Sequence, residues 1–323
     1  MKTSDFYYDL PQRLIAQTPM EPRDAARMMV IHRDTGLRED KIFRDMVDYL
    51  QPGDVMVINE TKVIPARLLG EKEDTKVPVE ILLLRRIDQT HWETLVRPGR
   101  RLKKDVTVSF GDGLLRARIG DTTDAGGRIV EFLYEGVFEE LLDRLGEMPL
   151  PPYIHEKLDD PTQYQTVYAK QEGSAAAPTA GLHFTPEVLN RVREKGVEIV
   201  PVLLHVGLGT FRPVKVEDVS KHVMHSEYYQ VTPEAAARIN AARPRGGRIV
   251  CIGTTSVRTL ETVADEQGIV HPGMGMTNIF ITPGVKLKAT DVLLTNFHLP
   301  ESTLLMLISA MMGREQALDA YRE

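Results

Sequence analysis

Six short stretches of strand-like sequence follow one another between residues 66 and 134, with no helical pattern between them. Turn-forming sequences separate them, among them Arg97-Pro98-Gly99 and Gly111-Asp112-Gly113. Strands joined by hairpin turns lie antiparallel, and a set of this size predicts a small barrel. The stretches cover residues 66–69, 79–84, 92–96, 106–110, 114–119 and 128–134.

Helices and strands alternate outside this block, which implies a parallel or mixed sheet with helices on its faces. We therefore expect a layered α/β domain (residues 1–64 and 151–323) interrupted by an inserted antiparallel β-barrel domain (residues 65–150). The chain is expected to start as a mostly helical, loop-rich segment. Helices are predicted over residues 43–50, 138–145, 188–195, 233–242, 256–264 and 302–312, and strands over 27–32, 54–59, 198–205, 248–252, 278–282 and 291–296.

The length and composition fit two domains in a reducing compartment. A chain of 323 residues exceeds the roughly 250–300 residues at which single cores stop growing. No run of 18 apolar residues predicts a membrane span, and the start of the chain lacks the apolar region of a secretory signal. The one cysteine, Cys251, excludes a disulfide framework and a cysteine-based metal site, so we expect a cytoplasmic protein.

The net charge of −6 argues against a protein that coats nucleic acid, which would normally be basic overall. Binding of a folded RNA would then need a local basic patch. One candidate is a loop of the expected barrel, and a second is the cluster Arg243, Arg245 and Arg248. Charged loops are usually only solvated, which is the alternative for both. The barrel loop carries Arg97, Arg100, Arg101, Lys103 and Lys104.

Parallel sheets place ligands at the carboxyl ends of their strands, so the strand-to-helix junctions are where a site is expected. The first junction has small residues around Thr179 and ends near His183. In the second, His205 precedes Gly207 and Gly209, which let a nucleoside ring approach the backbone. An inert packing loop and a structural histidine are the alternatives.

The third junction ends a strand in hydroxyl-bearing residues at a helix start, with Arg258 one turn into the helix. Such a nest can hold a carboxylate or a phosphate, and simple N-capping by Thr255 or Ser256 is the alternative. In the fourth junction, Asn296 and His298 lie between a strand and a helix. The expected ligand-binding residues of the third junction are Thr254, Thr255, Ser256 and Arg258.

Other kinds of site are disfavoured by the motifs. The GxGxxG and GxxxxGK[ST] patterns of dinucleotide and nucleoside triphosphate binding are missing. The spacing of His183, His205 and His298 matches no metal-binding pattern, so no metal is expected. The segment 221–227 offers two histidines and the carboxylate of Glu227, with a solvated loop as the alternative.

Together the junctions are far more specific than any one of them. With several other stretches they resemble the S-adenosylmethionine:tRNA ribosyltransferase-isomerase family of queuosine biosynthesis, over essentially the whole length. One departure is that family members usually continue past the last helix with an aromatic-containing tail, so we expect either a missing tail or a fraying helix. The matching stretches are residues 8–11, 14–17, 22–24, 59–68, 149–154, 164–169, 173–185, 205–213, 225–227, 253–261 and 295–309.

The resemblance implies an α/β domain with an inserted barrel, and a reaction. The ribosyl part of S-adenosylmethionine moves onto the aminomethyl group of a 7-deazaguanine at the tRNA wobble position. The products are epoxyqueuosine in the tRNA, adenine and methionine. S-adenosylmethionine is then a consumed substrate, no cofactor is expected, and the partners are S-adenosylmethionine and the modified tRNA.

Strand-end position and chemistry then suggest roles. The sulfonium acidifies the neighbouring C5′ hydrogens, adenine needs a hydrogen-bond donor to leave, and the attacking amine must be neutral. We expect His183, His205 and His298 as acid–base candidates, with Glu227 as a further base and Asn296 reading a base edge. The methionine carboxylate is expected at the third junction, and anticodon-arm phosphates at the barrel loop.

Two other classes of function stay open. A non-enzymatic RNA-binding module would also use a barrel, but it would predict a more basic chain and would leave the polar junctions unexplained. A methyltransferase would be expected to carry a glycine-rich loop after its first strand, and residues 55–65 offer none. The products separate the three classes, because methyl transfer releases S-adenosylhomocysteine.

Overall fold

The computed structural model describes residues 1–323 except 124–125, 157, 159 and 208–213. The chain divides into two compact units. The α/β unit comprises Met1–Thr61, Pro152–Gln171 and Ala177–Glu323, and the barrel unit comprises Lys62–Pro151 with Glu172–Ala176. Relative to the expected boundaries, residues 62–64, 151 and 172–176 group with the barrel unit.

Within the described residues, six antiparallel strands of the barrel unit form a sheet in the order β5-β6-β7-β10-β9-β8. Pairing of β5 with β8 closes it, which confirms the predicted barrel. Inward and outward residues alternate, as on β9, where Leu115 and Ala117 are buried and Arg116 is exposed. The strands are β5 (Arg67–Lys72), β6 (Pro78–Arg86), β7 (His91–Arg97), β8 (Thr107–Phe110), β9 (Leu115–Thr122) and β10 (Arg128–Leu133).

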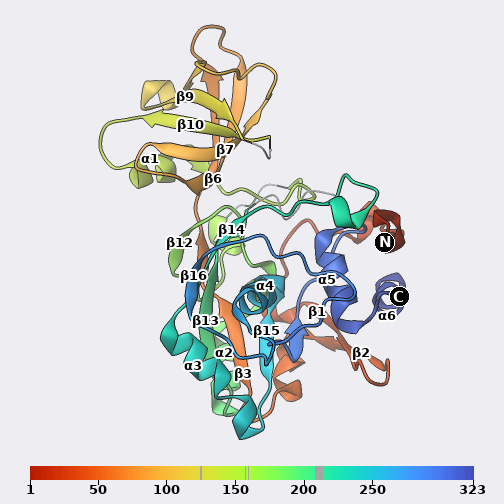
Figure 1. Cartoon of the computed structure of the whole chain (residues 1–323). Coiled ribbons are helices and arrows are strands. Elements are labelled where there is room, and N and C mark those ends of the chain that lie inside the picture. Colours follow the sequence, from red (N-terminus) through yellow and green to blue (C-terminus); the bar gives the residue numbers. More distant parts are fainter. Residues whose placement is uncertain (124–125, 157, 159, 208–213) are drawn as a thin grey trace. The chain divides into compact units, whose positions relative to one another are not determined.

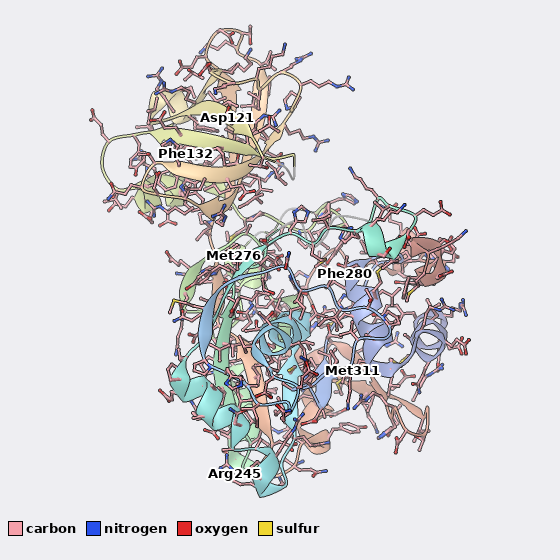
Figure 2. The ribbon with its side chains drawn as sticks, viewed as in Figure 1. Asp121, Phe132, Arg245, Met276, Phe280 and Met311 are labelled. Carbon is pink, nitrogen blue, oxygen red and sulfur yellow. The ribbon has the colours of Figure 1, made fainter. Side chains whose placement is uncertain are left out.

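Aromatic packing attaches helix α1 (Phe138–Leu145) to this unit. Phe138 lies 5.7 Å from Trp92 and 5.2 Å from Phe132 between ring centroids. Phe132 of β10 is fully buried (Figure 2). A two-residue strand, β11 (Gly146–Glu147), pairs with β5 directly after the helix. The short strands β4 (Thr61–Val63) and β12 (Gln171–Ser174) pair with each other.

The α/β unit is built on a mixed sheet with the order β16-β14-β13-β3-β15-β17 among the described residues (Figure 1). The four strands β13, β3, β15 and β17 run parallel, β14 pairs antiparallel with β13, and β16 pairs antiparallel with β14. The strands are β3 (Val55–Asn59), β13 (Glu198–Leu204), β14 (Glu227–Val231), β15 (Ile249–Ile252), β16 (Gly273–Thr277) and β17 (Val292–Leu294).

Helices cover both faces of the sheet, because its central strands are apolar on both sides. On β3, Met56 and Ile58 pack against helix α2 (Pro186–Glu194), while Val55 and Val57 face the opposite core with α3 (Pro233–Asn240). The second core also contains α4 (Gly253–Val263) and part of α5 (Thr303–Met312), which α6 (Arg314–Arg322) follows. No helix of the described residues is long and apolar enough to cross a bilayer.

One predicted strand is wrong, and two observed strands were not predicted. Residues 278–282 form no strand, although their sequence is apolar and β-branched. Ile279 and Ile281 pack into the core instead, while the glycine-rich strand β16 forms just before them because β14 supplies a pairing partner. Strand β14, which begins at Glu227, was not predicted, and its first residue is buried.

The start of the chain also differs from the expected helices. A hairpin of β1 (Arg27–Ile31) and β2 (Arg38–Ile42) lies there, and the expected helix over residues 43–50 is a 3₁₀ helix, η4 (Phe43–Tyr49). The other 3₁₀ helices of the described residues are only three to five residues long. They are η1 (Thr3–Phe6), η2 (Gln12–Leu14), η3 (Arg23–Ala25), η5 (Gly111–Gly113), η6 (Pro161–Tyr164), η7 (Thr179–His183), η9 (Val219–Lys221) and η10 (Arg243–Arg245).

Candidate active site

The polar junctions leave the sheet at one edge. The parallel strands β13, β3, β15 and β17 all end there, and β14 begins there because it runs antiparallel to β13. Glu227 pairs in register with Thr277, so the end of β16 lies at the same edge. This edge therefore carries the segments that follow each parallel strand, where ligands of such sheets bind.

His205 follows β13 and is held on two sides. Its Nδ1 lies 2.8 Å from the hydroxyl of Thr61, and its ring stacks on Tyr228 at 5.7 Å between centroids. The main-chain N–H of His205 also donates to the carbonyl of Tyr228. Burial lowers the pKa of His205, so the imidazole is neutral near pH 7.

The buried amide of Asn59 joins the ends of β3 and β13. Its Nδ2 donates to the carbonyl of Leu204, and its Oδ1 accepts from the main-chain N–H groups of Leu204 and Thr61 at 3.0 and 3.2 Å. Sequence reasoning missed Asn59 and Thr61 as site residues. Asn59 ends the buried strand β3 and Thr61 comes two residues later, so applying the same strand-end rule to β3 would have found them.

A buried ion pair lies beside this network. Arg258 on α4 donates to the Glu227 carboxylate, whose other oxygen accepts the main-chain N–H of Gly207 at 2.8 Å. Both carboxylate oxygens are therefore engaged. Arg258 is only 3% exposed, yet among the described residues its Nε and Nη2 have no hydrogen-bond partner. A buried guanidinium with two such donors is suited to bind an anion.

Helix α4 starts without a side-chain cap. Its N-cap residue is Ile252, and Gly253 takes a φ of +79° to turn the chain from β15 into the helix. The predicted alternative of N-capping by Thr255 or Ser256 is wrong, because both lie inside the helix and are buried with Thr254. The Ser256 hydroxyl donates to the carbonyl of Ile252, whereas the Thr255 hydroxyl has no partner among the described residues.

His183 lies at the end of η7, which begins at Thr179. Asn296 donates from Nδ2 to His183 Nε2 at 3.4 Å, so the first and fourth junctions meet. Burial lowers the pKa of His183, and a hydrogen bond to the main chain of Arg23 opposes that shift. The Oδ1 of Asn296 is buried and has no partner within the described residues.

Close packing explains a glycine of η7. A Cβ at Gly181 would lie 2.1 Å from the hydroxyl of Tyr168 and 2.9 Å from a methyl group of Thr166. A Cβ at Gly253 would lie 3.6 Å from the Cβ of Ala180 in the same 3₁₀ turn. The start of α4 and η7 therefore approach each other closely, which brings the first junction beside the third.

His298 is fixed mainly by its main chain. Its N–H donates to the Tyr321 hydroxyl, and its carbonyl accepts from the Tyr8 hydroxyl. The ring nitrogen Nε2 lies 3.2 Å from the hydroxyl of Thr295. Burial lowers the pKa of His298 to about 4. Among the described residues, no cluster of three His, Cys, Asp or Glu side chains is placed to hold a metal.

The predicted cationic residues of the barrel loop are all exposed. Lys104 forms an ion pair with Asp121 at 2.7 Å, and the other four form none within the described part of the chain. The second basic cluster is different, because Arg243, Arg245 and Arg248 each pair with a carboxylate. Since those arginines are already paired with carboxylates of the α/β unit, the barrel loop is the better candidate of the two for a basic patch that binds phosphates.

Gly209, a predicted ligand-binding residue, lies outside the described residues.

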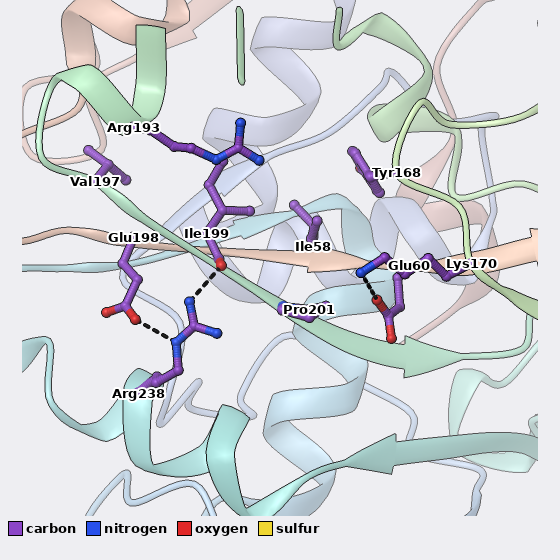
Figure 3. A pocket seen from close by; sticks show the side chains of 10 residues that line it. All are labelled: Ile58, Glu60, Tyr168, Lys170, Arg193, Val197, Glu198, Ile199, Pro201 and Arg238. Carbon is purple, nitrogen blue, oxygen red and sulfur yellow. Dashed lines mark hydrogen bonds and ion pairs between the residues drawn. The ribbon is translucent and has the colours of Figure 1, made fainter. Parts of the chain in front are cut away.

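A pocket of about 380 Å³ that sequence reasoning missed lies on the α2 face of β3 and β13 (Figure 3). Its floor is apolar, and Arg238 on its rim reaches both the Glu198 carboxylate and the carbonyl of Ile199. Tyr168 and Lys170 also line it, while the predicted site residues do not. Its lining residues come from separate segments, so no local motif identifies it.

Comparisons with known proteins identify the class. Residues 3–323 match the family described as queuosine biosynthesis protein. The S-adenosylmethionine:tRNA ribosyltransferase-isomerases of Symbiobacterium thermophilum and Moorella thermoacetica are each 62% identical over 323 residues, covering 100% of this chain and 95% and 94% of theirs. A crystal structure of S-adenosylmethionine tRNA ribosyltransferase from Thermotoga maritima is 39% identical, with a TM-score of 0.54 and coverage of 99% of this chain and 93% of that one.

The α/β fold with an inserted barrel and these relatives define a transferase–isomerase enzyme. The chain belongs to the queuosine biosynthesis protein family. The resemblance inferred from the motifs is thereby confirmed. The roles of individual residues, the boundaries of the domains and the expected lack of a cofactor stay predictions.

Proposed function

We propose that this enzyme transfers and isomerises the ribosyl part of S-adenosylmethionine onto 7-aminomethyl-7-deazaguanine at the tRNA wobble position. The products are epoxyqueuosine in the tRNA, free adenine and free methionine. The names of full-length relatives at 57–62% identity support the proposal. S-adenosylmethionine is consumed as a substrate and no other cofactor takes part. Because its other substrate is tRNA, we place the enzyme in the cytoplasm.

The structural observation that best supports this proposal is the polar start of α4. The substrate has a free α-carboxylate, and an uncapped helix start offers main-chain N–H groups to an anion. The partnerless donors of Arg258 and the hydroxyl of Thr255 lie one helical turn apart on the same side of this helix. We assign the methionine carboxylate to these groups, with Glu227 holding Arg258 in place.

The chemistry needs a base, a donor and a neutral amine. A base takes a proton from C5′, which the sulfonium acidifies. A carbon–nitrogen bond forms to the tRNA amine, and the ribosyl carbons close into the epoxycyclopentane of the product through a new carbon–carbon bond and a new carbon–oxygen bond. One ring carbon–oxygen bond, the glycosidic bond to adenine and the carbon–sulfur bond to methionine break. Of the protons lost from C5′ and the amine, one ends on adenine and one in solvent. Burial lowers the pKa of His183, His205 and His298, so they take part as neutral imidazoles. They are better candidates than Glu227, whose oxygens are engaged.

Product analysis tests the reaction. The protein is incubated with S-adenosylmethionine and tRNA carrying the aminomethyl base, and the small molecules are separated by chromatography and mass spectrometry. We expect equimolar adenine and methionine, and none with tRNA lacking the modified base. S-adenosylhomocysteine would instead identify a methyltransferase, and the absence of any product would contradict an enzymatic role on this tRNA.

A threonine pair on α4 tests the carboxylate assignment. Thr255→Val removes a hydroxyl proposed to bind the charged substrate, so we expect KM for S-adenosylmethionine to rise roughly tenfold or more. Thr259→Val is the matched control, because its hydroxyl donates to the Thr255 carbonyl within the helix. Equal KM values for the two variants would exclude Thr255 from the binding site.

A further inference from the structure

The hydroxyl of Thr61 has a single partner. Thr61 is fully buried at the start of β4, two residues after the end of β3, and its Oγ1 lies 2.8 Å from His205 Nδ1. No other hydrogen bond of this hydroxyl occurs among the described residues. A hydroxyl carries one donor and two acceptor positions, and a neutral imidazole carries one nitrogen of each kind. The direction of this one bond therefore decides the tautomer of His205.

Burial of the Thr61 hydroxyl decides which group donates in this hydrogen bond. If Nδ1–H donated to Thr61, the buried hydroxyl proton would have no acceptor among the described residues, and an unmade bond of a buried donor is costly. If the hydroxyl donates to Nδ1, its proton is satisfied. The neutral ring then carries its proton on Nε2.

The surroundings hold His205 in this arrangement. Asn59 fixes the main chain of Thr61, and Tyr228 stacks on the ring from the neighbouring strand. Burial lowers the pKa of His205, which keeps it neutral. Its Nε2 has no hydrogen-bond partner in the described part of the chain, and this atom is not fully buried. Nε2–H is thus accessible to a ligand.

We propose that Thr61 is a positioning residue that holds His205 as the Nε2–H tautomer, so that His205 donates a hydrogen bond to the substrate instead of removing a proton. The role of the donor rests on the proposed function. Departing adenine gains electron density on its ring nitrogens when the glycosidic bond breaks, and an N–H aimed at one of them stabilises that charge. Proton abstraction is left to another group, and His183 and His298 at the same edge are the candidates.

Substitution by glutamine distinguishes the role of hydrogen-bond donor from the role of base at position 205. His205→Gln retains an N–H donor but cannot act as a base, whereas His205→Ala has neither. We expect kcat of His205→Gln within roughly tenfold of the parent and kcat of His205→Ala lowered by roughly 100-fold or more. If both variants lose activity to the same extent, His205 is not a donor and the proposal is overturned.

The tautomer itself is measured without turnover. Long-range ¹H–¹⁵N correlation spectra of protein labelled at histidine distinguish a protonated Nε2 from a protonated Nδ1, and the missing signals of His205→Gln identify the ring. We expect the Nε2–H form in the resting protein, and an Nδ1–H form would overturn the proposal. This result stands even if the parent releases no adenine, in which case only the proposed reaction fails.

Two Thr61 variants test the positioning role. Thr61→Ser keeps the hydroxyl, so we expect the parental ring spectrum and a kcat within twofold. Thr61→Val keeps the shape and removes the donor, so we expect a shifted Nδ1 signal, a populated second tautomer and a kcat lowered roughly tenfold with KM within twofold. An unchanged Nδ1 signal in Thr61→Val would show that Thr61 does not set the tautomer.

Discussion

At the scale of single residues, the histidines at the sheet edge differ in what surrounds their ring nitrogens. His205 is paired with a buried hydroxyl, His183 with the amide of Asn296, and His298 with the hydroxyl of Thr295. In each case burial lowers the pKa. A lowered histidine pKa means that the unfolded chain binds a proton more tightly than the folded one.

This difference makes stability depend on pH. For His298 the stability is fully present above the ordinary pKa of 6.5 and is lost as the pH falls toward about 4. The free energy of unfolding of the parent should fall as the pH falls below 6.5. We expect His298→Gln to reduce the slope of this fall by up to about 1.4 kcal/mol per pH unit. Urea unfolding at pH 7 and pH 5 measures it, with the exposed His155→Gln as control. Equal pH slopes for parent and His298→Gln would contradict the prediction.

At the scale of elements, one carboxylate holds the starts of two central strands together. Asp54 is fully buried before β3 and accepts from Arg248 through its main-chain N–H at 2.8 Å and its Nη2 at 2.7 Å. It also accepts from the main-chain N–H of Gln51. Burial raises the pKa of Asp54, but these hydrogen bonds outweigh burial, so the pKa lies below 3.8. β3 and β15 thereby keep their parallel register.

Asp54→Asn should lower the free energy of unfolding by about 3 kcal/mol, since it leaves Arg248 without its counter-charge. The stabilisation of the parent is present above pH 3.8 and is lost as the pH falls below it, so the two proteins should converge in acid. Urea unfolding followed by circular dichroism measures the difference. Asp48→Asn, at an exposed position, is the control and should stay within about 0.5 kcal/mol.

At the scale of the whole molecule, charge is distributed unevenly. The net charge is −6, and the arginines of the α/β cluster are each paired with carboxylates. The barrel loop differs from this cluster, because Arg97, Arg100, Arg101 and Lys103 are exposed without an ion pair in the described part of the chain. An acidic protein that binds tRNA needs such a local patch.

We expect Arg100→Gln, Arg101→Gln and Lys103→Gln together to weaken tRNA binding and to lower the slope of log K against log salt by roughly one per lost phosphate contact. Filter binding over a range of salt concentrations measures both quantities. Arg116→Gln with Arg118→Gln is the matched control on the same barrel, because both arginines are paired with carboxylates. An unchanged slope in the triple variant would exclude the loop as a docking surface.

Much of the fold could be predicted from local patterns. The alternation of apolar and charged residues at Leu115, Arg116 and Ala117 indicates a strand whatever its tertiary surroundings. Thr185 followed by Pro186 marks the start of α2. Strand β16 could not be predicted, because its glycines and methionines form a strand only where β14 provides backbone partners. The strand predicted over residues 278–282 is wrong for the converse reason. Their apolar side chains pack into the core, but their backbone has no neighbouring strand to pair with.

The sequence by itself determined the barrel, the alternation of helices and strands, and which polar segments follow the parallel strands, because these depend on neighbours within about ten residues. Only the tertiary structure decided that Thr61 bonds His205, that Glu227 pairs with Arg258, and which of the basic clusters is free. Those outcomes depend on which distant groups are buried together, and the free energy of burying a polar group is set by the partner it finds there.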